Sequence, residues 1–172
     1  MKKQLLLIAL CFVAAVGLMA CGDSSSPGSD ETKAEEKVYG VGDTWEVDGQ
    51  WKLTINSATP TDARNEYADK EAAQVIIVEY TYENLGYVDS NGIMDGLYFD
   101  LSSQQIVDEK GTMGYSYPGD IQSYPQEVPE GANCTAQACI GVDNESSKLK
   151  IIVSNYDGND KDQKATFEIP VK

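Results

Sequence analysis

Cysteine is the most reactive residue type available to this sequence, which has four cysteines and no histidine. A cysteine attacks substrates as its thiolate, which forms most readily beside a histidine or another cation. Cys134 and Cys139 are therefore poor candidates for catalytic nucleophiles. The lack of histidine also excludes histidine-based triads, zinc sites that contain histidine, and haem ligation by histidine.

Cys134 and Cys139 allow two structural interpretations. Two thiols in an exported protein favour a disulfide that closes a loop. The residues around them nevertheless alternate, with one apolar face made of Cys134, Ala136, Ala138, Ile140 and Val142. Five residues of extended strand span roughly 16 Å, far beyond the ~7 Å that a disulfide allows between Cα atoms. We favour the strand, with Cys134 as a small buried residue.

Other enzyme motifs are missing or incomplete. The segment from Gly114 to Pro118 has a proline where a nucleophile elbow needs glycine, and no G-x-x-x-x-G-K phosphate loop occurs. Carboxylate pairs are uninformative, because the region from Val38 onward holds 23 acidic residues. We therefore expect no catalytic residues and no enzymatic activity.

Two acidic segments contain the oxygen ligands that calcium prefers. One holds Asp157, Asn159, Asp160 and Asp162, and the other holds Asp89, Asn91 and Asp95. Neither has the glycine at the sixth position and the glutamate at the twelfth that an EF-hand requires. Glycine, asparagine and aspartate also build turns without any metal. We favour turns here, and predict no metal site and no cofactor.

A tyrosine-rich segment, GYSYPGDIQSYP, is the first candidate for a contact surface. It contains Tyr115, Tyr117 and Tyr124. Tyrosine offers a broad apolar ring with a polar end, which suits a sugar ring or a protein partner. Exposed tyrosines are equally ordinary on strand faces and in loops, so this segment supports binding without identifying a ligand.

The N-terminus predicts export and lipid attachment. Lys2 and Lys3 precede an apolar run, and Leu18-Met19-Ala20-Cys21 follows it directly. The apolar run is shorter than the roughly 20 residues of a membrane-spanning helix, which leaves an uncleaved anchor as the weaker alternative. The motif resembles bacterial lipoprotein signals. By that resemblance residues 1–20 are a signal peptide, and Cys21 becomes the lipidated first residue, its sulfur carrying a diacylglycerol group with two acyl chains such as palmitate.

Residues 21–37 are predicted to form a flexible acidic linker. This stretch is rich in serine, glycine and acids and has no aromatic or branched aliphatic residue. A flexible coil of this length spans roughly 20 to 24 Å on average. The part from Val38 to Lys172 has 9 basic and 23 acidic residues, a formal charge of −14. We expect it to be tethered at the outer face of the cell membrane, repelled by anionic headgroups, and unable to bind nucleic acid.

Residues 38–172 alternate with a period of two, which is typical of strands buried on one face. The apolar positions of the four clearest stripes are Trp51, Leu53 and Ile55; Ile76, Val78, Tyr80 and Tyr82; Leu97, Phe99 and Leu101; and Ala165, Phe167, Ile169 and Val171. Thr61 to Ala73 alone resembles a short helix. Asp108 to Gly111 predicts a hairpin turn, and Leu149–Asn155 with Lys164–Val171 predict a terminal hairpin. The pattern predicts an all-β fold, an antiparallel β-sandwich.

The chain resembles an immunoglobulin-like domain of unknown function that is common in lipoproteins of Gram-positive bacteria. The resemblance rests on Val41-Gly42-Asp43-Thr44-Trp45, on the run Val75 to Gly86, on the turn at Asp108 to Gly111, and on Val128-Pro129-Glu130-Gly131. That family is similar in shape to a mycobacterial immunoprotective extracellular antigen. The resemblance implies an immunoglobulin-like β-sandwich and no catalytic residues. The cysteine pair at positions 134 and 139 is a departure from the family pattern.

The sequence thus favours a lipid-anchored extracytoplasmic module that binds another macromolecule or belongs to an envelope assembly, without turnover. The alternative is a surface lipoprotein that binds calcium or a saccharide through the acidic turns or the tyrosine segment. Its expected partners are the membrane, through the lipid anchor, and a surface protein or glycan.

Overall fold

The computed structural model describes residues 37–92 and 96–172. The predicted signal peptide, Cys21 and all of the predicted linker except Lys37 lie outside the described residues. Asp95, one of the calcium candidates, also lies outside them.

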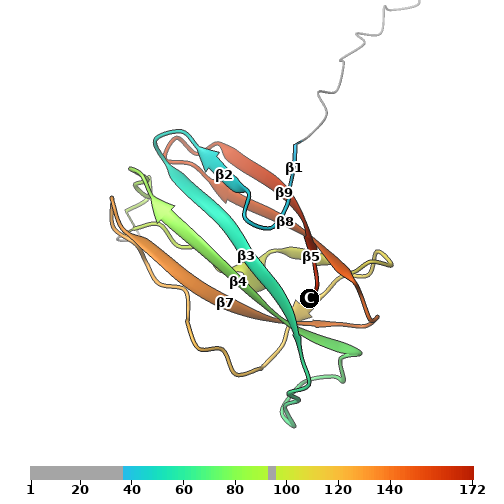
Figure 1. Ribbon diagram of the computed structural model, residues 1–172. Helices are drawn as coiled ribbons and strands as arrows, with labels where there is room; N and C mark the ends of the chain where they lie inside the picture. Colours follow the sequence, from blue (N-terminus) through green and yellow to red (C-terminus); the bar gives the residue numbers. More distant parts are fainter. Residues whose placement is uncertain (1–36, 93–95) are drawn as a thin grey trace, which may run out of the picture. The chain divides into compact units, whose positions relative to one another are not determined.

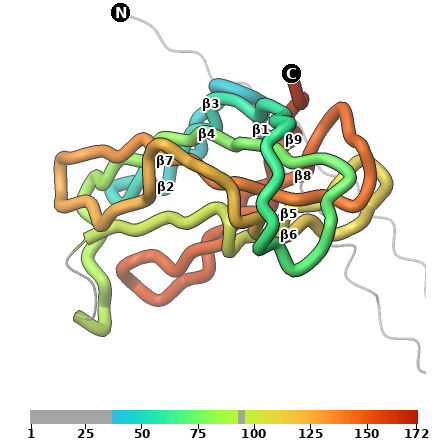
Figure 2. The backbone as a smooth tube through the Cα atoms, turned by 90° about the horizontal axis from the view of Figure 1, so that it is seen from below, coloured from blue at the N-terminus to red at the C-terminus, as the bar shows by residue number. Residues whose placement is uncertain are grey.

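The described chain forms two β-sheets that enclose one main core (Figures 1 and 2). One sheet has the order β1-β9-β8-β5 and the other has the order β2-β3-β4-β7-β6. Neighbouring strands are antiparallel except β1 and β9, which are parallel. The strands are β1 (Val38–Tyr39), β2 (Thr44–Val47), β3 (Trp51–Thr61), β4 (Gln74–Asn84), β5 (Gln105–Val107), β6 (Tyr115–Ser116), β7 (Asn133–Val142), β8 (Lys148–Tyr156) and β9 (Asp162–Pro170).

The strand order is that of an immunoglobulin-like sandwich, which confirms the predicted fold. In that fold strands A, B, E and D form one sheet and G, F and C form the other. Here β3, β4, β7 and β6 occupy the first set of positions, and β9, β8 and β5 occupy the second. Strands β4 and β8 contain no cysteine, so the disulfide that joins strands B and F in antibody domains has no counterpart here.

Alternation along each strand builds the core. Leu53 and Ile55 of β3, Tyr80 of β4 and Phe167 of β9 are fully buried between the sheets. A register shift between Ile55 and Ser57 changes the phase of β3, so that Ala58 also points into the core. An aromatic cluster at one part of this core makes edge-to-face contacts among Trp45, Trp51, Tyr82, Tyr87 and Phe99.

The predicted strand at Leu97–Leu101 is wrong, although its burial pattern is right. Leu97, Phe99 and Leu101 are all buried. Leu97 forms only an isolated bridge to Val128, and a 3₁₀ turn, η1 (Leu101–Ser103), follows. Asp100 caps that turn by accepting hydrogen bonds from the amide and the hydroxyl of Ser102. Alternate burial therefore arises here without a ladder of backbone hydrogen bonds.

The predicted helix at Thr61–Ala73 is also wrong. Thr61 ends β3, and the residues after it form turns and irregular chain. Side chains satisfy the backbone locally: the Thr61 hydroxyl accepts from the backbone amide of Ala63, and the side-chain oxygen of Asn65 accepts from the backbone amide of Tyr67. Such local bonds compete with the regular hydrogen bonds of a helix.

The predicted turns and terminal hairpin are confirmed. Gly111 has a φ of 86° and its amide donates to the carbonyl of Asp108, as the glycine of a tight turn should. Strands β8 and β9 pair along their whole length, from Lys148 with Pro170 to Tyr156 with Asp162. Pro170 is the last residue of β9, where the lack of an amide hydrogen breaks no ladder.

Within the residues that the structure describes, no helix is long and apolar enough to cross a membrane.

Candidate functional site

A second, smaller apolar cluster lies on the outer side of the five-stranded sheet. Its buried members are Val75, Tyr117 and Cys139, and Ala68, Ala72, Ile77, Tyr115 and Ile121 pack against them. The loop after β3 supplies Ala68 and Ala72, the segment after β6 supplies Tyr117 and Ile121, and strands supply the rest. These two segments therefore cover part of a sheet face that would otherwise be open.

The two cysteines are not bonded to each other. Both lie on β7, and both thiols are free. The strand interpretation is confirmed, and Cys134 packs against the main core on the predicted apolar face, although it is only half-buried. Cys139, on the other face, is the more deeply buried of the two, at 5 % exposed. Cys139 is buried because residues 115–121 fold over the outer face of β7, which the period of two along β7 could not reveal. Burial raises the pKa of the Cys139 thiol, which keeps it protonated and unreactive.

Tyr117 is not part of an exposed contact surface, contrary to the sequence-based expectation. It is 5 % exposed, and its hydroxyl accepts a hydrogen bond from the amide of Asn65. The Asn65 side chain in turn donates to the carbonyl of Pro118. Tyr117 joins the loop after β3 to the segment after β6.

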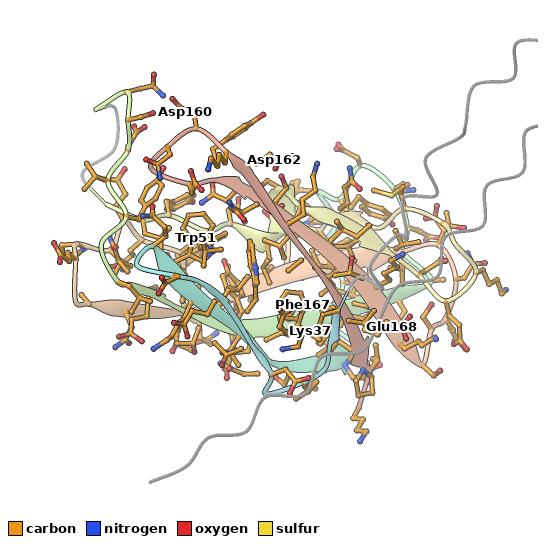
Figure 3. All side chains as sticks on the ribbon, turned by 90° about the horizontal axis from the view of Figure 1, so that it is seen from above. Lys37, Trp51, Asp160, Asp162, Phe167 and Glu168 are labelled. Carbon is orange, nitrogen blue, oxygen red and sulfur yellow. The ribbon has the colours of Figure 1, made fainter. Side chains whose placement is uncertain are left out.

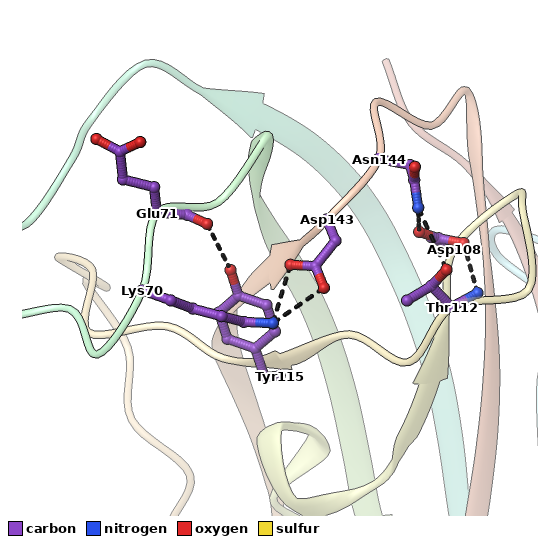
Figure 4. Close-up of polar contacts among 7 residues, drawn as sticks. All are labelled: Lys70, Glu71, Asp108, Thr112, Tyr115, Asp143 and Asn144. Atoms are coloured by element: carbon purple, nitrogen blue, oxygen red, sulfur yellow. Dashed lines mark hydrogen bonds and ion pairs between the residues drawn. The ribbon is translucent and has the colours of Figure 1, made fainter.

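Tyr115 is half-buried and has several partners (Figure 4). The Lys70 ammonium lies 4.0 Å from the centre of its ring and also pairs with the Asp143 carboxylate at 2.9 Å. The Tyr115 hydroxyl donates to the backbone carbonyl of Glu71. A side chain at Gly141 would overlap the Tyr115 ring, so glycine there allows the ring to lie against β7.

Of the three tyrosines predicted to form a contact surface, Tyr124 is the exposed one, with 65 % of its surface accessible. It lines a cleft of about 320 Å³ that also involves Tyr98, which is 38 % exposed. The buried residues Ala138 and Cys139 also line this cleft. We call it the tyrosine cleft; its polar lining residues include Asp100, Ser102, Ser116 and Gln137.

Hydrogen bonds from β4 and β7 hold the segment that carries Tyr124. The hydroxyl of Tyr82, in β4, donates to the backbone carbonyl of Gln126 and accepts from the backbone amide of the same residue. The backbone amide of Gln137, in β7, donates to the backbone carbonyl of Ser123. The side-chain oxygen of Gln137 accepts from the backbone amide of Gln122. These bonds come from strands of the sandwich, so the exposed ring is presented by a fixed backbone.

The residues at and before η1 also line the tyrosine cleft. Asp100 caps the 3₁₀ turn by its hydrogen bonds with Ser102. Tyr98 lies two residues before Asp100. Burial raises the pKa of Tyr98, and the carboxylates of Asp100 and Glu127 raise it further. Tyr98 is therefore a neutral phenol at physiological pH and can donate a hydrogen bond.

A second cleft, of about 460 Å³, adjoins Tyr124. We call it the amide cleft, because the side chains of Gln122, Gln126 and Asn133 line it. Glu127, Cys134 and Thr135 contribute to the same lining. Tyr124 lines both clefts, so the two adjoin each other at this residue.

Another depression, of about 660 Å³, has a different character. All of its lining residues except Tyr117 belong to one loop, Arg64 to Ala72. The charged side chains are of mixed sign, and Lys70 is already paired with Asp143. This depression presents no exposed aromatic face toward a ligand.

The acidic turns use their carboxylates internally. Asp157 accepts from the amides of Asn159 and Lys161 and from the side chain of Gln163. Burial alone would raise the pKa of Asp157, but these bonds hold it below the ordinary value. Among the described residues no group of three or more histidine, cysteine or acidic side chains is placed to hold a metal ion.

The other candidates of this region have partners of their own. Asp160 accepts from the Ser90 hydroxyl, and Asp162 accepts from the Ser154 hydroxyl and pairs with Lys164. Both lie toward the tip of the β8–β9 hairpin (Figure 3). Asp89 accepts from the amide of Asn91 in a turn.

Sequence reasoning missed Tyr98, Asp100 and Gln137. Tyr98 has a detectable signal, since it occupies the polar position of the alternating segment between Leu97 and Phe99. No sequence signal marks Asp100 and Gln137, because they line the same cleft as Tyr124 only through contacts among three segments that are far apart in the chain.

Comparisons with known proteins bear on the fold alone. No family model and no curated protein matches the sequence. The chain is similar to the crystal structure of the YjhA protein of Bacillus subtilis, with a TM-score of 0.53 and 13 % identity, over 78 % of this chain and 100 % of that one. It is also similar to MPT63, a secreted protein of Mycobacterium tuberculosis, with a TM-score of 0.48 and 15 % identity, over 80 % of this chain and 98 % of that one.

Proposed function

We propose that this protein is a lipid-anchored, extracytoplasmic immunoglobulin-like module that binds a component of the cell envelope without chemical turnover. The observation that carries the binding function is the pair of exposed tyrosines, Tyr98 and Tyr124, that line one cleft. Tyrosines with an apolar face and a polar tip are typical of recognition sites. The surrounding backbone is held by the sandwich, which reduces the ordering cost of binding.

The anchoring part of the proposal rests on the sequence. Leu18-Met19-Ala20-Cys21 resembles a lipoprotein signal, and residues 22–37 have the composition of a flexible linker. Two acyl chains give durable attachment, whereas one gives reversible attachment. By this proposal Cys21 carries the lipid, in a Gram-positive bacterium, and the linker leaves the tyrosine cleft accessible.

The absence of turnover is supported by the residues of the site. Cys139 is buried with a raised thiol pKa, and the chain has no histidine to act as a base. The polar groups of the tyrosine cleft are suited to hydrogen bonding. This proposal therefore assigns them to binding.

Two experiments test this function. In the first, the wild type and a Cys21→Ala variant are expressed in the producing bacterium, and membrane and soluble fractions are compared. We expect the wild type in the membrane fraction, with a fatty acid on Cys21, and loss of both in the variant. An unacylated Cys21 in the wild type overturns the anchor.

In the second experiment, the full chain in detergent is mixed with isolated cell envelopes from which lipids have been extracted. We expect the wild type to sediment with the envelopes and a Tyr98→Ala/Tyr124→Ala variant to remain in solution. A Tyr156→Ala variant is the matched control, because Tyr156 is also exposed but lines neither cleft. Equal sedimentation of all three proteins, or of none, overturns the binding function.

A further inference from the structure

The tyrosine cleft and the amide cleft share one lining residue. Tyr124 lines both of them. Tyr98, from the first cleft, also lies close enough to Glu127, from the second, to be affected by its charge. A ligand bound at Tyr124 can therefore extend into both clefts, which suits a chain of repeated units better than one compact molecule.

The polar side chains that line the two clefts carry mainly amide and hydroxyl groups. Ser102, Ser116 and Gln137 belong to the first cleft, and Gln126 and Asn133 belong to the second. The Oε1 atom of Gln137 accepts from Gln122, but its Nε2 atom has no hydrogen-bond partner among residues 37–92 and 96–172. Uncharged donors and acceptors of this kind match ligand hydroxyl and amide groups.

The charge of the site argues against an anionic ligand. Among the described residues that line the two clefts, none is a lysine or an arginine. The charged members are Asp100 and Glu127, and the region from Val38 onward has a formal charge of −14. A phosphate-bearing polymer or an acidic peptide would be repelled.

A saccharide satisfies all three conditions. We infer that the two clefts form one site for a neutral saccharide chain, with one sugar ring stacked on Tyr124 and hydroxyl groups of the adjoining units hydrogen-bonded in the clefts. The apolar face of a sugar ring suits the tyrosine ring, and its edge hydroxyls suit the surrounding amides. This inference rests on the proposed function and specifies its ligand.

Direct binding of defined sugars tests the inference. The full chain in detergent is titrated with maltohexaose, cellohexaose and chitohexaose, and with a neutral proline-rich peptide as the other class of ligand. We expect at least one hexasaccharide to bind and its monosaccharide to bind at least about tenfold more weakly, because the monosaccharide covers only part of the site. Binding of the peptide with no binding of any saccharide overturns the inference.

Three variants locate the site. Tyr124→Ala is expected to weaken saccharide binding by about tenfold or more, as loss of a central aromatic contact does. Tyr124→Phe keeps the ring and is expected to stay within about threefold of the wild type. Tyr156→Ala is the control and is expected to have no effect. Equal binding by Tyr124→Ala and the wild type overturns the inference.

Treatment of the envelopes distinguishes this inference from the proposed function. We expect periodate oxidation of envelope sugars to abolish sedimentation of the protein, and protease treatment to leave it unchanged. Sedimentation that requires Tyr124 but is lost only after protease treatment refutes the saccharide and preserves the binding function. No sedimentation with untreated envelopes refutes the binding function itself.

Discussion

The hydroxyl of Tyr82 holds the backbone of Gln126 by two hydrogen bonds, donating to its carbonyl and accepting from its amide at 2.9 Å. Tyr82 is fully buried in β4, whereas Gln126 lies two residues after the exposed Tyr124. A residue of the core therefore fixes the segment that presents the binding ring. This pair connects the stability of the sandwich with the geometry of the candidate site.

Replacing Tyr82 by phenylalanine should destabilise the protein by about 1 to 3 kcal/mol. The ring remains in the core, but the amide and carbonyl of Gln126 lose their partner. Urea unfolding at neutral pH measures the change as a lower midpoint with an unchanged slope. Tyr156→Phe, at an exposed position, should shift the midpoint very little. Equal midpoints for the two variants would contradict the role assigned to the Tyr82 hydroxyl.

Gly119 and Cys139 should show strong coupling in a double-mutant cycle. A Cβ atom at Gly119 would overlap the Sγ atom of Cys139, so Gly119→Ala should destabilise the protein. Cys139→Ala removes that sulfur and makes room for the new methyl group. We expect a coupling free energy of about 1 kcal/mol or more between the two substitutions, from chemical denaturation of all four proteins. Additive effects would show that the segment after β6 moves away freely.

The two thiols of β7 should differ in reactivity. Cys139 is buried and has a raised thiol pKa, whereas Cys134 is half-buried. We expect a maleimide reagent to label Cys134 in the native protein and to label Cys139 only in denaturant. Mass spectrometry of Cys134→Ser and Cys139→Ser variants assigns each label. An intramolecular disulfide between these residues, or faster labelling of Cys139, would contradict the structure.

Asp108 should make the stability of the protein sensitive to acid. Burial alone would raise the pKa of Asp108, but hydrogen bonds from Asn144, Thr112 and Lys110 lower it overall. Because the pKa is lower in the folded than in the unfolded state, the carboxylate stabilises the fold above pH ~4, and this contribution disappears as the pH falls further.

The variant Asp108→Ala tests this dependence. We expect it to be less stable than the wild type at pH 7, and the difference to shrink as the pH falls below about 4. Urea midpoints at pH 7, 4 and 3 measure both effects. Asp69→Ala, at an exposed loop position, is the control and should follow the wild type at each pH. A difference between Asp108→Ala and the wild type that stays constant with pH would contradict the role of the carboxylate.

The sequence alone determined the class of the fold. A period of two places Leu53, Tyr80 and Phe167 on inner faces, because each strand turns successive side chains to opposite sides of a sheet. The hairpin turns at Asp108 and between β8 and β9 follow from the backbone freedom of glycine and the turn chemistry of aspartate and asparagine. These signals are local, so they can be read without the partner strands.

Only the tertiary structure decided which tyrosines are available to a ligand. Tyr115, Tyr117 and Tyr124 lie within ten residues of one another, yet Tyr117 is buried under the loop after β3 and Tyr124 is exposed. The other residues that line its cleft come from distant segments, among them Tyr98 and the β7 residues Gln137 to Cys139. Burial and the assembly of a cleft depend on contacts between segments that are far apart in the chain, and no local spacing of residues encodes those contacts.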